Sequence, residues 1–189
     1  TTNDALNLAI GEGQANALLD RKAHLKAFFL LLRLAENEYG LIVEKNQAEV
    51  LYTHLENFHF VEEVEVIQKN TDSFLLLVGS LSRKYLAELF PNISIPSQPY
   101  QWVSIEWNSL LYQIVSYSET GDMGFLIFTE EIEFLITEFK KRNIPAIDEQ
   151  IYDILRIEAG FPKYGLDMTE ENLLPETGLE QKAVSYSKG

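Results

Sequence analysis

AFFLLLRLAENEYGLIVEK, residues 27–45, decides the fold class, because two apolar runs flank a short polar loop that ends in a glycine. The first run, 27–34, is dense in large apolar side chains and is too short for a typical helix. The loop closes at Gly40, and the second run begins at Leu41. Two such runs around a Gly-ending loop predict a β-hairpin, and therefore an antiparallel sheet.

A helix is predicted directly after this hairpin. Asn46 followed by Glu49 is typical of the cap pair that opens a helix. We expect its buried side to carry Val50, Leu51, Leu55 and Phe58.

Shorter elements follow, up to the first proline. We predict strands at 64–67 and 73–79 and a helix at 82–90, which Pro91 terminates. The stretch 91–99, PNISIPSQP, is the best internal boundary in the chain, because prolines and serines alternate there with small residues.

The second half repeats this mixture of strands and helices. Strands are predicted at 102–107 and 110–118, where aromatic and β-branched residues are frequent, and the run FLIFT ends at Thr129. Thr129 is the predicted cap of a helix whose apolar positions have helical spacing: Ile132, Leu135, Ile136 and Phe139. A last helix is predicted from about Asp148 to Ala159.

These elements predict an α+β fold with mainly antiparallel sheets and packed helices, because hairpins and helices alternate without the rhythm of βαβ units. We expect a first α+β subdomain at 1–90, a linker at 91–99 and a second α+β subdomain at 100–189.

Composition narrows the classes of partner. The 189 residues carry a net charge of −14, which repels phosphate backbones and disfavours nucleic acid as a direct partner. No apolar run approaches the roughly 20 residues of a membrane span. The chain has no cysteine and shows no signal peptide, so we expect a soluble cytoplasmic protein without membrane partners.

Common catalytic and metal motifs are not found. His54 and His59 are five residues apart, which does not fit zinc ligands at i, i+4 on a helix. The loops 11–13 and 121–124 contain glycines but match no phosphate-binding fingerprint, and we interpret them as turns. We predict no metal site.

The closing segment, residues 156–189, has a different character. Its charged residues, glycines and prolines follow neither helix nor strand periodicity. Gly160 and Pro162 are explained as the end of the last helix, and Asp153 can pair with Arg156 three residues along it. Neither the end of the helix nor this pairing explains the other polar residues of the segment.

At these residues the chain resembles the folate-binding YgfZ/GcvT family, the relatives of the glycine-cleavage T protein. The family pattern R-x-E-x-G-x-P-x-x-G-x-D is present from Arg156 to Asp167. Pro175-Glu176 follows, without the residue that separates the two in the family, and then Lys188-Gly189. Thr2-Asn3-Asp4 is similar to the T-N-D near the start of the family's first subdomain, and Gly79 to a glycine after a core strand.

The resemblance implies that the chain is a fragment. The family continues K-G with C-Y-x-G-Q-E and a small β-barrel, and it has about 50 further residues before T-N-D. By this likeness the hallmark cysteine would follow Gly189.

The resemblance also separates two branches of the family. Aminomethyltransferases have an aspartate at about Ala27-Phe28, a glutamate at Leu126 and an arginine near Tyr152. With these three polar groups replaced, little is left to act as acid, base or anchor. The chain is therefore identified as closer to the YgfZ branch.

By likeness to that branch we expect a folate-binding accessory protein without autonomous catalysis. Its cofactor would be tetrahydrofolate or a folate derivative, and its partners iron–sulfur client proteins in iron–sulfur cluster assembly or tRNA modification. The alternatives are a tetrahydrofolate-dependent aminomethyltransferase, or a relic whose pocket is filled by side chains.

We name no catalytic residue. The candidate folate-binding residues are Arg156, Glu158, Asp167 and Lys188, and the other interpretation is that these residues brace the subdomain junction.

Overall fold

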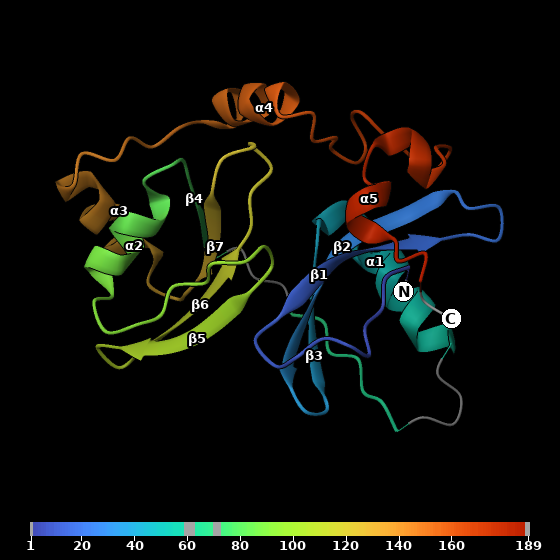
Figure 1. The fold of residues 1–189 in the computed structure, drawn as a ribbon, viewed down its shortest axis with the longest axis horizontal. Coiled ribbons are helices and arrows are strands. Elements are labelled where there is room, and N and C mark those ends of the chain that lie inside the picture. Colours follow the sequence, from blue (N-terminus) through green and yellow to red (C-terminus); the bar gives the residue numbers. More distant parts are fainter. Residues whose placement is uncertain (1, 59–62, 70–72, 188–189) are drawn as a thin grey trace. The chain divides into compact units, whose positions relative to one another are not determined.

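The computed structural model describes residues 2–58, 63–69 and 73–187, and it divides the chain into two units (Figure 1). The first unit combines Thr1–Asn70 with Pro162–Gly189, and the second is the continuous stretch Thr71–Phe161. The predicted linker 91–99 lies inside the second unit, where Ile95 is part of the hydrophobic core. The chain thus leaves the first unit and returns to it, so the closing segment belongs with the beginning of the sequence.

The first unit is built on a three-stranded antiparallel sheet of order β1-β2-β3. Its strands are β1 (Gly13–Leu19), β2 (Leu25–Ala35) and β3 (Glu38–Val43). Strands β2 and β3 form the predicted hairpin, in which Phe29 lies opposite Val43 and Leu31 opposite Leu41. The hairpin prediction is confirmed.

Helix α1 (Lys45–Phe58) packs on one face of this sheet, against β2. Successive strand residues point to opposite faces, so Ala27, Phe29 and Leu31 share a face. All three are buried in one cluster with Leu51 of α1.

Two details of the predicted helix are wrong. The helix begins at Lys45, so Asn46 lies inside it, and the Asn46 side chain donates to the carbonyl of Tyr164 at 3.3 Å. Val50 and Phe58 are 47% and 68% exposed, because only the stripe that contains Leu51 and Leu55 faces the sheet.

The strand predicted at 64–67 is also wrong. Residues 63–69 form neither helix nor strand, and most of their side chains are exposed. A β-strand requires a hydrogen-bonded neighbour, and within the described residues no ladder includes this segment.

The second unit contains a four-stranded antiparallel sheet of order β4-β7-β6-β5. The strands are β4 (Phe74–Val78), β5 (Trp102–Trp107), β6 (Leu110–Ser116) and β7 (Gly124–Phe128). Helices α2 (Ser82–Leu89) and α3 (Ile132–Lys141) lie on the same face of it (Figure 1). The four strands and two helices match their predicted positions closely.

One apolar core joins these helices to the sheet. It combines side chains from one face of the four strands with those of α2, of α3 and of the segment that follows α2: Leu77, Leu86, Leu89, Phe90, Ile95, Ile105, Tyr112, Ile114, Phe125, Ile127, Leu135 and Phe139. Helix α3 begins two residues later than Thr129 would place it, and the Thr129 hydroxyl oxygen instead accepts from the amide of Glu131 at 3.3 Å.

Three further helical elements complete the chain. Helix α4 (Glu149–Glu158) ends the second unit, while the short helices η1 (Leu174–Thr177) and α5 (Glu180–Ala183) belong to the first. Helix α5 packs against β1. Thr2 ties the two together, since its hydroxyl donates to the carbonyl of Ala183 at 2.6 Å and accepts from the amide of Ala17 at 2.8 Å. The predicted class, α+β with antiparallel sheets and packed helices, is confirmed.

Candidate functional site

Helix α4 has a well-defined beginning and end, which position the first two candidate residues. Asp148 is its N-cap, and the carboxylate of Asp148 accepts from the amide of Ile151 at 2.9 Å. Gly160 has a left-handed φ of 69°, and the amide of Phe161 donates to the carbonyl of Arg156 at 2.8 Å. This closing bond spans five residues, which is the pattern of a Schellman motif.

Arg156 is the only buried residue of this helix, with 2% of its surface exposed. The guanidinium Nε donates to Asp153 Oδ1 at 2.7 Å, and Nη1 donates to the carbonyl of Phe161 at 3.1 Å. The predicted pairing with Asp153 is confirmed. These bonds hold the last turn of α4 to the chain that follows it, so Arg156 has a structural role whatever else it does.

Glu158 and Asp167 are both exposed, in different units. The Asp167 carboxylate accepts from the amide of Lys163 at 2.9 Å and closes a turn in which Gly165 has a φ of 86°. Lys188 lies outside the described residues. A common folate site made by the four candidate residues therefore stays a prediction.

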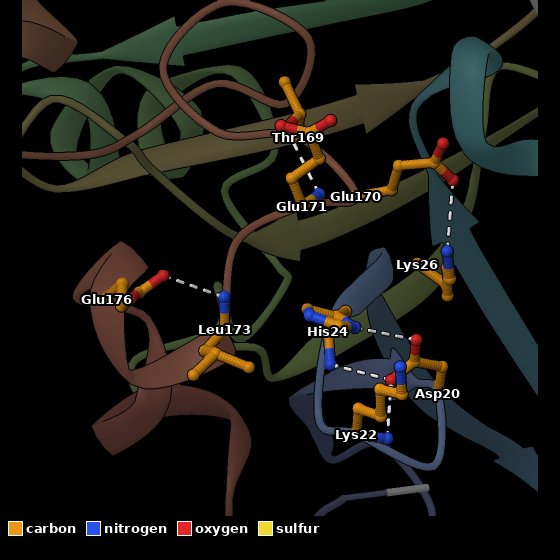
Figure 2. Close-up of polar contacts among 9 residues, drawn as sticks. All are labelled: Asp20, Lys22, His24, Lys26, Thr169, Glu170, Glu171, Leu173 and Glu176. Atoms are coloured by element: carbon orange, nitrogen blue, oxygen red, sulfur yellow. Dashed lines mark hydrogen bonds and ion pairs between the residues drawn. The ribbon is translucent and has the colours of Figure 1, made fainter.

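The rest of the closing segment is held against the β1–β2 turn, as Figure 2 shows. The amide of Leu25 donates to the carbonyl of Asn172 at 2.9 Å, and His24 forms an isolated bridge with Leu173. Lys26 makes an ion pair with Glu170 at 3.1 Å, although 68% of the glutamate side chain is exposed. Both backbone and side-chain contacts thus hold the closing segment to the rest of the first unit.

Glu176 has a structural role within its own turn. Its carboxylate accepts from the amide of Leu173 at 3.0 Å at the start of η1, and Pro175 occupies one of the first two positions of that helix. Both residues of the Pro175-Glu176 pair are accounted for by helix initiation.

Asp20 stabilises the β1–β2 turn, which the closing segment contacts. Its carboxylate accepts from the amides of Lys22 and His24 at 2.8 and 2.9 Å and contacts His24 Nδ1 at 2.9 Å (Figure 2). These hydrogen bonds, the one with the imidazole first, lower the pKa of Asp20 from 3.8 to about 2.

The three positions at which polar residues of aminomethyltransferases were expected are occupied by residues with structural roles. Ala27 is fully buried in β2, and the neighbouring amide of Phe28 donates to the side chain of the buried Gln47 at 2.6 Å. Leu126 is 7% exposed in β7. The hydroxyl of Tyr152 donates to Glu119 Oε2 at 2.7 Å.

Glu119 also accepts a hydrogen bond from the hydroxyl of Tyr117, so one carboxylate serves two phenols. Burial, followed by the proximity of Glu119, raises the pKa of Tyr117 well above its usual value. Sequence reasoning missed this cluster, because Glu119 and Tyr152 are 33 positions apart and no local pattern links a loop acid to a helix phenol.

Within residues 2–58, 63–69 and 73–187, no group of three histidine or acidic side chains could hold a metal ion. None of the helices described there is long and apolar enough to cross a membrane.

Comparison with known proteins assigns the family. Residues 1–188 match the GCVT N-terminal domain, and the chain belongs to this family. It is 25% identical over 198 residues to the aminomethyltransferase of Pelodictyon phaeoclathratiforme, covering 100% of this chain and 54% of that protein. It is 28% identical over 192 residues to the aminomethyltransferase of Aquifex aeolicus, covering 100% of this chain and 51% of the relative.

A solved structure is similar as well. The glycine cleavage system aminomethyltransferase T from Bartonella henselae matches with a TM-score of 0.73 and 25% identity, over 89% of this chain and 46% of that one. The chain thus spans about half the length of the relatives it matches.

Proposed function

We propose that this chain is a folate-binding part of a tetrahydrofolate-dependent protein of the cytosol. The observation that carries the proposal is the family match over residues 1–188, together with a fold similar to that of an aminomethyltransferase. Folate binding is the property that the accessory-protein and aminomethyltransferase interpretations of the sequence share.

Among the candidate residues, Glu158 is best suited to contact a ligand directly. It is exposed on the last turn of α4, whereas the guanidinium of Arg156 is buried against Asp153 and Phe161. A carboxylate accepts hydrogen bonds from the amino and ring N–H groups of a pterin, which are donors. Arg156 would then position the helix end, while Asp167 and Lys188 stay candidate folate-binding residues of the closing segment.

Calorimetric titration with tetrahydrofolate tests this proposal. We expect saturable binding, and we expect Glu158→Gln to weaken it about tenfold, which corresponds to one charge-assisted hydrogen bond. Glu130→Gln is the matched control, because Glu130 is also an exposed glutamate of the second unit. Absence of binding by the unmodified protein would refute the proposal.

The relatives' names favour aminomethyl transfer, and the acceptor that we propose for it is tetrahydrofolate. We propose it as the reaction of the whole protein, of which this chain would supply part of the folate site. Turnover of an aminomethyl donor with tetrahydrofolate as acceptor, by the whole protein, is the direct test. Product formation that requires both substrates would establish it.

A second candidate is the accessory role in iron–sulfur enzyme maintenance or tRNA modification that the YgfZ branch suggests. The replacements at Ala27, Leu126 and Tyr152 favour it, since the two apolar side chains cannot transfer a proton and the hydroxyl of Tyr152 already donates to Glu119. Folate binding without turnover would support this role. Unchanged iron–sulfur enzyme activity and tRNA modification in cells that lack the protein would exclude it.

A further inference from the structure

A groove of about 550 Å³ lies in the first unit between α1 and the turn after β1. Its volume falls in the range of roughly 300–1,000 Å³ that is typical of small-molecule sites. Its apolar wall comes from Leu18 and Leu19 at the end of β1 and from Val50 and Phe58 of α1.

The helix contributes a stripe of side chains at four-residue spacing, namely Val50, His54 and Phe58. Residues four apart are neighbours on one face of a helix. The rings of His54 and Phe58 are stacked, with centroids 4.4 Å apart and an angle of 27° between the planes. Because Leu51 faces the sheet, this stripe is turned away from the core and lines the groove.

The charged side chains at the groove differ in whether they already form a hydrogen bond or an ion pair within the chain. Asp20 is bound by His24, Lys26 by Glu170, and Glu49 weakly by Thr53 at 3.5 Å. Arg21 has no hydrogen bond or ion pair with any part of the chain that the structure describes. The groove therefore combines an apolar, partly aromatic wall with one unpaired guanidinium.

We propose that this groove binds a small aromatic anion, with its ring on the stripe of Val50, His54 and Phe58 and its anionic group at Arg21. Planar apolar ligands stack on aromatic side chains, and a guanidinium pairs with carboxylate, sulfonate or phosphate groups. The net charge of −14 opposes anions at long range, so selection for an anion rests on Arg21.

This site goes beyond the proposed function. None of the candidate folate residues that the structure describes, Arg156, Glu158 and Asp167, lines the groove.

The first test maps a probe on the unmodified chain. We use 8-anilinonaphthalene-1-sulfonate, an aromatic anion, and follow its fluorescence and the NMR signals of isotope-labelled Leu, Ile and Val methyl groups. We expect one saturable site and shifts of the methyls of Leu18, Leu19 and Val50. Shifts confined to other exposed apolar residues, such as Ile154 of α4, would overturn the proposal.

The second test separates the ring contact from the charge contact, with N-phenyl-1-naphthylamine as the uncharged counterpart of the probe. Arg21→Gln is expected to weaken the anionic probe about threefold to fivefold, the range of an exposed ion pair, and to leave the neutral probe unchanged. Val50→Asp is expected to weaken both more than tenfold, because it places a charge in the apolar wall.

Ile154→Asp is the matched control, because Ile154 is 57% exposed on a helix of the other unit, compared with 47% for Val50. It should leave both probes unaffected, and an equal loss with this variant would overturn the proposal. Circular dichroism checks that each variant is folded, and the map on the unmodified chain does not depend on any variant.

The variant Glu158→Gln tests the separateness of the groove. It should leave the affinity of the anionic probe unchanged, and a loss of probe binding equal to the loss of tetrahydrofolate binding would overturn a separate site. The folate titration of the unmodified chain is a different measurement, so either proposal can fail without the other.

Discussion

At the scale of single residues, Arg156 shows how a motif position can serve the fold. Its guanidinium is almost fully buried, and it bonds Asp153 and the carbonyl of Phe161. Arg156→Gln leaves these acceptors without their charged donor in a buried setting, so we expect a loss of about 2–4 kcal/mol in the free energy of unfolding. Urea denaturation followed by circular dichroism measures it.

The control for this prediction lies two residues further along the same helix. Glu158→Gln changes an exposed side chain and should alter the free energy of unfolding by less than about 0.5 kcal/mol. Equal stability of the two variants would show that the bonds of Arg156 do not hold the helix end.

Asp20 gives a pH-dependent prediction, because its pKa is lowered from 3.8 to about 2. A carboxylate with a lowered pKa stabilises the folded state above its unfolded value of 3.8, and this contribution disappears as the pH falls through about 2. Asp20→Asn should therefore lower the melting temperature near pH 6, and the difference from the unmodified chain should shrink below pH 4 and vanish only below about pH 2.

Melting curves at several pH values measure this effect. Asp122→Asn is the control, since Asp122 is an exposed aspartate in the other unit. A difference for Asp20→Asn that stays constant from pH 6 to pH 2 would contradict the prediction.

Residue roles could be predicted from the sequence only where the partner is close in the chain. The pair of Asp153 and Arg156, three positions apart on one helix, was predictable, as was Gly160 at the helix end. The bond between Tyr152 and Glu119 was not, since it depends on how α4 packs against a loop 33 residues earlier.

At the scale of elements, the start of β7 has no space for a larger residue. Gly124 lies opposite Val78, and a Cβ at this position would be 2.8 Å from the carbonyl oxygen of Tyr117 and 2.9 Å from Cβ of Ser118. Gly124→Ala should therefore force the backbone apart and cost about 1–3 kcal/mol, which thermal and urea denaturation can measure.

Gly40→Ala is a suitable comparison for this prediction. There the nearest atom to an added Cβ is the flexible end of the Leu34 side chain at 3.2 Å, which can move at a smaller cost. If Gly40→Ala proved more destabilising than Gly124→Ala, the explanation by backbone crowding would be wrong.

Elements were predictable where the apolar pattern and the loop chemistry agreed. The hairpin of β2 and β3 has two apolar runs and a polar loop that ends in Gly40, and every strand of the second unit has a similarly clear pattern. The segment 64–67 has strand-like composition, but composition does not reveal whether a neighbouring strand is available for pairing.

At the scale of the whole molecule, the closing segment belongs to the unit that contains the start of the chain. Thr2 bonds the carbonyl of Ala183, and Leu25 bonds that of Asn172. The Pro- and Ser-rich stretch 91–99 reads as a boundary because it breaks local periodicity, yet it lies within the second unit, where Ile95 is buried. Local composition marks loops, whereas membership of a unit depends on contacts between distant segments.

This discontinuity leads to a prediction about isolated fragments. A fragment of residues 71–161 contains the complete four-stranded sheet, α2, α3 and α4, and the core that joins them, so we expect it to fold alone. A fragment of residues 1–70 has the three-stranded sheet and α1 but lacks α5, which packs on β1, and should not fold until residues 162–189 are supplied as a peptide.

Both tryptophans of the chain, Trp102 and Trp107, lie in the second unit, so tryptophan fluorescence reports on the folding of the 71–161 fragment. Circular dichroism and NMR dispersion follow the 1–70 fragment with and without the peptide. Cooperative folding of residues 1–70 alone would show that the closing segment is not required for the first unit.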